Sequence, residues 1–176
     1  MEKARRKIKS RIEKNMDLRC DYIMMETYLQ YSIGRRTYKV KQSYYYCDEF
    51  WVSIEGKYAK VGITDVFQKT CGAIVRVHLF LGKKVSQFEV IGRMESIYTV
   101  VPIISPISGR VLELNPILED EVFLINESPY EDGWIAKLEL AEGYEREVEK
   151  LEVAEDYFET MKKRLERSRE GNKLNP

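Results

Sequence analysis

The side chains with the most reactive chemistry are few and widely spaced. Three cysteines (Cys20, Cys47 and Cys71) and one histidine, His78, occur in 176 residues. No Cys-x-x-Cys pair accompanies them, so the sequence predicts free thiols and no metal site, because zinc takes about four such ligands. Cys71 lies in an apolar run and is predicted to be buried, whereas His78 is predicted to face outward from a strand.

Catalysis would require titratable groups that converge on one point. Glu95 and Tyr98 are three residues apart, which places them on opposite faces of a strand. No histidine stands near Cys20 or Cys47 in the sequence to act as a general base. We therefore expect a protein that is not an enzyme and has no catalytic residue.

The net charge of zero is the sum of a basic N-terminal part and two acidic parts that follow it. Residues 1–46 hold 12 Lys and Arg against 5 Asp and Glu, residues 47–141 hold 9 against 14, and residues 142–176 hold 8 against 10. A basic head can bind nucleic acid or a membrane surface, or can be a solvated helix facing the acidic body. We favour the solvated helix, because the basic residues are sparse and lack a Gly and aromatic RNA-binding pattern.

The sequence has no apolar stretch long enough to cross a membrane and no signal peptide. We therefore expect a cytoplasmic protein.

The hydrophobic pattern divides the chain into four parts. Residues 1–36 are predicted to form a basic helical extension, with a thin apolar stripe every fourth residue over 2–16. Residues 37–141 form a β domain and residues 142–169 an amphipathic helix, followed by a frayed tail at 170–176. The predicted strands are 38–46, 50–54, 57–62, 73–80, 88–98, 109–114, 121–126 and 133–140. A short helix is expected at 64–70, with Thr64 as its N-cap.

Three groups of motifs follow one another in the β domain. They are Trp51-Val52 with 59–68, then 92–97 with Ser105-Pro106-Ile107-Ser108-Gly109, then 113–115 with 124–134. In order and spacing they resemble the glycine cleavage H-protein family, which are lipoyl carriers, over roughly residues 48–140. The resemblance implies a mainly β fold, a flattened antiparallel β-barrel or barrel-sandwich hybrid of the lipoyl-domain type, with helices outside.

The resemblance also implies a function. In this family a hairpin tip presents a lysine whose amine is acylated by lipoic acid, and the arm carries an aminomethyl group between partner enzymes. The family hairpin reads Glu-Ser-x-Lys, but here it reads Glu95-Ser96-Ile97-Tyr98, and no lysine occurs from 85 to 136. Since an amide needs an amine, no lipoate is expected at Tyr98.

Two interpretations of the altered tip remain open. The segment Tyr98, Thr99, Val100 and Val101 either docks to lipoate-dependent enzymes, such as glycine cleavage components or a lipoate ligase, or is covered by the protein's own N-terminal extension. The alternative function is a carrier with lipoate on another lysine, of which Lys83, Lys84 and Lys137 are the nearest in sequence.

Two further departures concern the neighbours of the hairpin. A proline at position 102 resembles the sequence of the lipoate-binding proteins of a heterodisulfide-reductase-like sulfur oxidation system. A further alternative is therefore that this protein is a relative of those lipoate-binding proteins. Phe88 stands where the family has a turn glycine, directly before Glu89.

Overall fold

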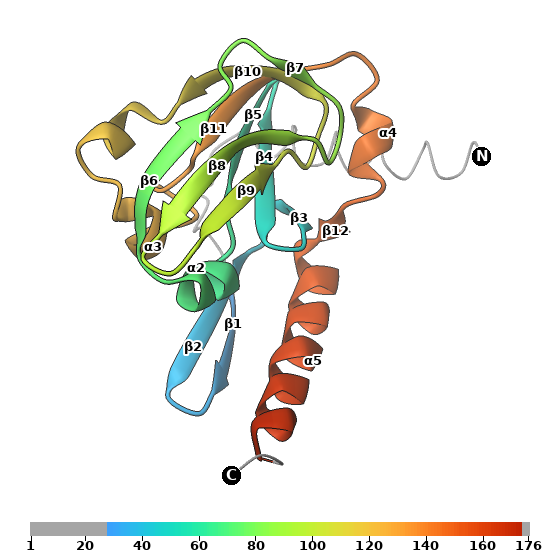
Figure 1. Cartoon of the computed structure of the whole chain (residues 1–176). Helices are drawn as coiled ribbons and strands as arrows, with labels where there is room; N and C mark the ends of the chain where they lie inside the picture. The colour runs from blue at the N-terminus through green and yellow to red at the C-terminus, as the bar shows by residue number, and fades with distance from the viewer. Residues whose placement is uncertain (1–27, 174–176) are drawn as a thin grey trace, which may run out of the picture.

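The computed structural model, which describes residues 28–173, arranges the strands in three antiparallel sheets with helices packed around them (Figure 1). One sheet pairs β1 with β2, one has the order β12-β3-β4-β5-β11-β10-β7, and one has the order β6-β8-β9. The strands are β1 (Tyr28–Ile33), β2 (Arg36–Lys41), β3 (Tyr45–Cys47), β4 (Phe50–Glu55), β5 (Tyr58–Ile63), β6 (Ile74–Leu79), β7 (Lys84–Val85), β8 (Val90–Ser96), β9 (Val100–Ile104), β10 (Gly109–Leu114), β11 (Ala136–Leu140) and β12 (Glu152–Val153). The helices are α2 (Asp65–Cys71), the 3-10 turn η1 (Pro116–Glu119), α3 (Leu124–Glu127), α4 (Glu145–Val148) and α5 (Ala154–Lys173).

The prediction of a mainly β fold with antiparallel sheets is confirmed, and the sheets do not form a closed barrel. Within the described residues, the seven-stranded sheet ends at β12 on one side and at β7 on the other, so it does not close on itself. The predicted strands at 50–54, 57–62, 73–80, 88–98, 109–114 and 133–140 correspond to β4, β5, β6, β8, β10 and β11. Helix α2 begins as expected, because Thr64 Oγ1 accepts the Phe67 N–H at 3.3 Å.

Several segments depart from their predicted structure. Residues 28–36 are not helical, because Tyr28–Ile33 alternates in side-chain character and Gly34, at φ +63°, turns the chain into β2. The predicted strand 38–46 is divided by a turn at 42–43, and residues 121–126 form a loop and the start of α3. Strand β9 was not predicted. The predicted helix at 2–16 lies outside the described residues.

The C-terminal region is not one long helix, as its periodicity suggests. Chain pairing interrupts it, because Glu152 and Val153 pair with Tyr46 and Tyr45 of β3, and Leu151 is buried in the core. The interruption separates the short α4 from α5, and α5 continues through the first residues of the predicted tail to Lys173. The pairing with β3 therefore determines the structure at 152–153, although the local periodicity predicts a helix there.

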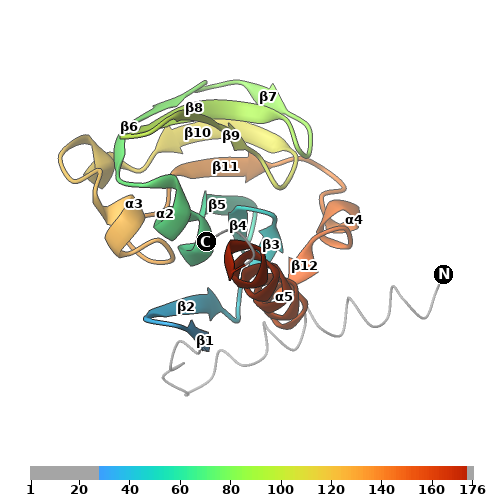
Figure 2. The same ribbon diagram turned by 60° about the horizontal axis from the view of Figure 1, so that its bottom comes forward.

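Two hydrophobic cores hold the molecule together. The first lies between the seven-stranded and three-stranded sheets, where Val52 and Val61 of one sheet join Ile91, Met94 and Ile103 of the other. The second lies on the opposite face of the large sheet, which the β1–β2 hairpin and α5 cover (Figure 2). It is rich in aromatic side chains, and Tyr46 stacks on Tyr157 with ring centroids 4.4 Å apart.

Phe88 occupies a backbone conformation that suits glycine. Its φ is +69°, which is strained for a residue with a side chain. Because the side chain is 45% exposed, burial of the ring stabilises the fold only a little against this strain.

We expect Phe88→Gly to raise the free energy of unfolding by about 1 kcal/mol, measured by urea unfolding. The control is Ser86→Gly in the same turn, where φ is not positive. Glycine should lower stability there by about 0.5–1 kcal/mol, and equal effects of the two variants would contradict the assignment of strain to Phe88.

Candidate functional site

The hairpin between β8 and β9 ends in a tight turn, at the position where the resemblance to the H-protein family predicts a lysine. The Ser96 N–H donates to the Thr99 carbonyl at 2.8 Å, and Ser96 Oγ accepts the N–H groups of Tyr98 and Thr99 at 3.2 and 3.1 Å. The serine side chain therefore satisfies donors that the turn would leave unpaired. This arrangement explains why a serine stands two residues before Tyr98.

Tyr98 lies at the end of this turn and projects from the molecule. Its side chain is 77% exposed, and Val100, Ile97 and Val75 beside it are 59%, 58% and 52% exposed. One edge of the ring rests on Gly72, because a methyl group placed there would lie 2.6 Å from Tyr98 Cδ2. The tip thus presents an apolar surface with an aromatic ring at its end.

A chain of hydrogen bonds fixes the tip to the body of the protein. The Ile97 N–H donates to the Ala73 carbonyl at 3.0 Å, so the turn is tied to the loop after α2. Asn126 of α3 holds that loop, because its Oδ1 accepts the Ile74 N–H at 2.8 Å and its Nδ2 donates to the Gly72 carbonyl at 3.1 Å. The tip is therefore braced by two helices.

Removal of this amide should loosen the tip. We expect Asn126→Ala to lower the free energy of unfolding by about 1–2 kcal/mol, since the Ile74 N–H and the Gly72 carbonyl lose a partner. The Ile97 amide should exchange with solvent about tenfold faster, as measured by hydrogen–deuterium exchange. The matched control is Glu127→Ala, an exposed neighbour on the same helix, which should leave both quantities nearly unchanged.

The prediction that Glu95 and Tyr98 occupy opposite faces of one strand is wrong, because β8 ends at Ser96 and Tyr98 lies in the turn that follows. Glu95 itself lies on β8. Its carboxylate lies between two arginines of the outer sheet face, 3.8 Å from Arg76 Nη1 and 3.9 Å from Arg93 Nε. At these distances and exposures the pairs are worth little in stability. Among the described residues, Glu95 and Tyr98 are not joined by a hydrogen bond, and nothing here has the geometry of an acid–base pair.

Two of the three alternative attachment lysines, Lys83 and Lys84, lie far from the tip. Lys83 Nζ contacts the Val90 carbonyl at 3.3 Å, at the beginning of β8, while the tip follows Ser96 at the end of the same strand. Six residues of strand correspond to about 20 Å. Lys84 lies next to Lys83 on β7, and Lys137 on β11 pairs with Glu113 at 3.2 Å.

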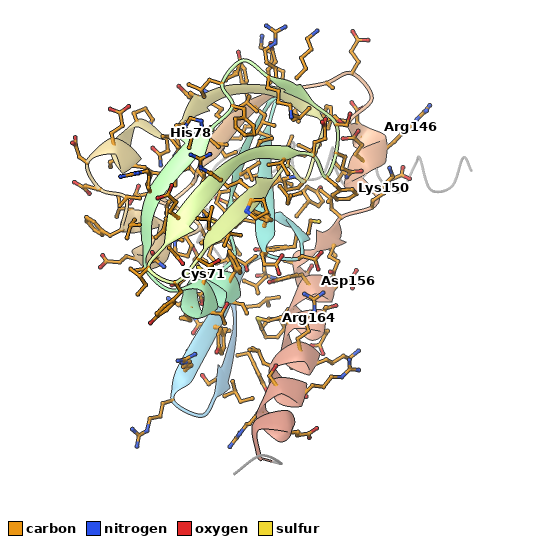
Figure 3. All side chains as sticks on the ribbon, in the orientation of Figure 1. Cys71, His78, Arg146, Lys150, Asp156 and Arg164 are labelled. Atoms are coloured by element: carbon orange, nitrogen blue, oxygen red, sulfur yellow. The ribbon has the colours of Figure 1, made fainter. Side chains whose placement is uncertain are left out.

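Among the described residues, neither Cys47 nor Cys71 forms a hydrogen bond with His78. Cys71 ends α2 and His78 lies exposed near the far end of β6 (Figure 3). Burial raises the pKa of the Cys47 thiol to about 11, which suppresses the thiolate that nucleophilic chemistry needs. Cys20 lies outside the described residues.

Residues 28–173 contain neither a cluster of metal ligands nor a helix that could cross a membrane. No three His, Cys, Asp or Glu side chains there are arranged so that they could hold a metal ion. None of the helices in the same range is both long and apolar enough to cross a membrane.

Asn126 and Gly72 are the residues of the tip that sequence reasoning missed. Asn126 is in one of the motifs, but the pattern predicts a strand over 121–126, in which the amide would have no role in the tip. Its contacts with Ile74 and Gly72 span more than 50 positions of sequence. The only available signal was Gly72, two residues after the end of the predicted helix, where a glycine is typical of a helix C-terminus.

Comparisons with known proteins agree on one family. The sequence model of the glycine cleavage H-protein matches residues 42–164. The glycine cleavage system H protein 4 of Aquifex aeolicus is 42% identical over 135 residues, which cover 76% of this chain and 78% of the relative. A crystal structure of a glycine cleavage system H protein from Mycobacterium marinum matches with a TM-score of 0.55 and 30% identity, over 66% of this chain and 94% of that one. This chain belongs to the glycine cleavage H-protein family.

Proposed function

We propose that this protein is an H-protein-like domain that does not carry lipoate at its hairpin and that acts as a binding or regulatory partner of lipoate-dependent enzymes. The single observation that supports it most is Tyr98 at the tip of the β8–β9 turn, in the position of the family's lysine. A phenol offers no amine for the amide bond to lipoate. The protein then has no arm with which to carry an aminomethyl group.

The rest of the hairpin supports a binding role. The turn keeps the serine that closes it, and Asn126 and Gly72 brace it against the body. A braced apolar surface loses little conformational entropy when a partner covers it. Tyrosine is also among the residues that most often dominate protein interfaces. Tyr98, Thr99, Val100 and Val101 are therefore the proposed contact segment.

The proposed partners are enzymes that accept a lipoyl-bearing hairpin, such as glycine cleavage components or a lipoate ligase. A tip without an arm would occupy the same entrance and exclude the loaded carrier, so the protein would act as a competitor. It would not itself be a catalyst, since the described residues form no convergent acid–base or nucleophilic group near the tip.

Binding of purified glycine cleavage components and of a lipoate ligase to the immobilised full chain tests this role. Tyr98→Asp should weaken the binding at least tenfold, because a carboxylate replaces the central aromatic contact. Leu81→Asp is the matched control, since Leu81 is 61% exposed just beyond the far end of β6 and should not affect binding. Equal weakening by both variants, or no binding by any of these enzymes, would remove the proposal.

Intact mass after incubation with lipoate and its ligase distinguishes this proposal from the alternative, which is a carrier with lipoate on another lysine. The wild-type mass should stay unchanged. A gain of one lipoyl group on Lys83, Lys84 or Lys137 would instead establish a carrier with an unusual attachment site.

A further inference from the structure

The β1–β2 hairpin is an addition to the family domain. The family match begins at residue 42, directly after β2. The hairpin forms a sheet of its own beside α5, and its turn extends beyond the two larger sheets (Figure 1). Tyr31 of β1 donates through its hydroxyl to Glu166 of α5 at 2.8 Å. One face of the hairpin is thus packed against the helix.

The outer edge of β2 is covered by side chains. The Lys39 N–H donates to Asp65 Oδ2 at 2.8 Å, and the Lys39 carbonyl accepts from the Tyr130 hydroxyl at 2.8 Å. The Lys41 N–H and carbonyl both bond to the Tyr46 hydroxyl at 2.8 Å. The main-chain groups of these residues therefore point away from β1, and none of them can pair with another strand.

The outer edge of β1 is not covered in this way. In an antiparallel pair, two opposed residues either bond to each other or both point outward. Gln30 is opposite Lys39 and Ser32 is opposite Thr37, whose carbonyl accepts from Lys69 on the outer edge. The main-chain N–H and carbonyl groups of Gln30 and Ser32 must then point outward, and they have no partner among the described residues.

Nothing in the sequence of β1 protects this edge. Natural proteins block open edges with lysine, proline, a bulge or an inward charge. The strand reads Tyr-Leu-Gln-Tyr-Ser-Ile, with no charge and no proline, and its pairing with β2 runs without a bulge. An edge of this kind is suited to the addition of another strand.

We propose that a second copy of this chain occupies the edge, so that β1 pairs antiparallel with β1 of its partner across a two-fold axis. Gln30 of each copy then lies opposite Ser32 of the other, and the two residues exchange hydrogen bonds in both directions. The result is a continuous four-stranded sheet in the order β2-β1-β1-β2.

The side chains of β1 complement one another in this register. Tyr31 meets Tyr31 of the second copy, and Leu29 meets Ile33. All three are half-buried on the face that packs on α5, and a two-fold axis perpendicular to the sheet keeps them on that face in both copies. Their exposed parts would be covered by the dimer, and aromatic and β-branched cross-strand pairs stabilise sheets.

The chain's own N-terminal residues are a less suitable occupant. To add a neighbouring strand, they would have to reverse direction tightly just before Tyr28. Such turns use glycine, proline, asparagine, aspartate or serine, and none of these occurs in residues 22–27, the six residues before Tyr28. This favours the second copy.

Sedimentation equilibrium and hydrogen–deuterium exchange on the full wild-type chain test the dimer. We expect a monomer–dimer equilibrium in which the Gln30 and Ser32 amides exchange at least tenfold more slowly above the dissociation constant than below it. Protection of these amides in a monomer at every concentration would assign the edge to the chain's own residues and overturn the proposal. A monomer with both amides unprotected throughout would overturn it as well.

A proline variant adds an independent measurement. Gln30→Pro removes an N–H that points away from β2, so it costs the hairpin no hydrogen bond but blocks edge pairing. We expect the dissociation constant to rise at least tenfold. Gln30→Ala is the matched control, because it shortens the same side chain and keeps the N–H, and it should dimerise like the wild type. A similar rise for both variants would show that the main chain of β1 is not the contact.

Discussion

The Tyr98→Lys variant is expected to accept one lipoyl group, whereas the wild-type chain accepts none. The substitution places an ε-amine at the end of the β8–β9 turn, at a position that is 77% exposed. Ser96 and Asn126 hold the turn through main-chain atoms and do not depend on the tyrosine ring. Lipoate can then form an amide through its carboxyl group, and intact mass after incubation with a lipoate ligase gives the result directly.

Ile97→Lys is the matched control for this experiment. It places the same amine one residue earlier on the turn, on the residue whose own N–H donates to the Ala73 carbonyl. The Ile97 side chain is 58% exposed, so a lysine there would also be accessible. If position along the turn decides recognition, this variant should stay unmodified. An unmodified Tyr98→Lys, in a reaction that lipoylates an ordinary H protein, would mean that more than the lysine separates this hairpin from its family.

The tip shows what a single sequence can and cannot predict. The resemblance to the H-protein family predicted the hairpin and the substitution of its lysine, because the motifs around Ser96 and Ser105-Pro106 consist of neighbours in sequence. It did not reveal the brace, since Asn126 meets Gly72 only after two sheets and two helices have packed. Long-range polar contacts of this kind leave little trace in local pattern.

The errors in the fold have the same origin. The apolar residues of 144–168 recur at helical spacing, but Glu152 and Val153 gain a strand partner in β3 and interrupt the helix. Strand β9 contains Pro102 and lies at the edge of its sheet, where a proline costs no ladder bond, so its composition did not resemble a strand. In both cases the position within a sheet decided the structure, and one sequence does not give that position.

Tyr130 joins the added hairpin to the family domain. Its side chain is buried, and its hydroxyl donates to the Lys39 carbonyl of β2 at 2.8 Å and accepts the Asp65 N–H at the start of α2 at 3.2 Å. Burial also raises its pKa well above the usual tyrosine range, so the hydroxyl keeps its proton. One oxygen atom thus bridges a strand that precedes the family match and a helix within it.

We expect Tyr130→Phe to lower the free energy of unfolding by about 2–4 kcal/mol, because a buried carbonyl and a buried N–H both lose their partner. Urea unfolding measures this as a lower midpoint at an unchanged m value. The ring remains, so its packing against Trp51 and Tyr46 is retained and the loss reports the hydroxyl alone.

Tyr45→Phe separates the bridge from a general effect of removing a hydroxyl. Tyr45 is half-buried on β3, and its hydroxyl makes no hydrogen bond to the described residues, so the expected change is within about 0.5 kcal/mol. If Tyr130→Phe were no more destabilising than Tyr45→Phe, the hairpin would be held by its other contacts, among them Asp65 and the Tyr46 hydroxyl, without a contribution from the Tyr130 hydroxyl. A loss confined to the Tyr130 variant would show that the family domain and its added hairpin unfold as one unit.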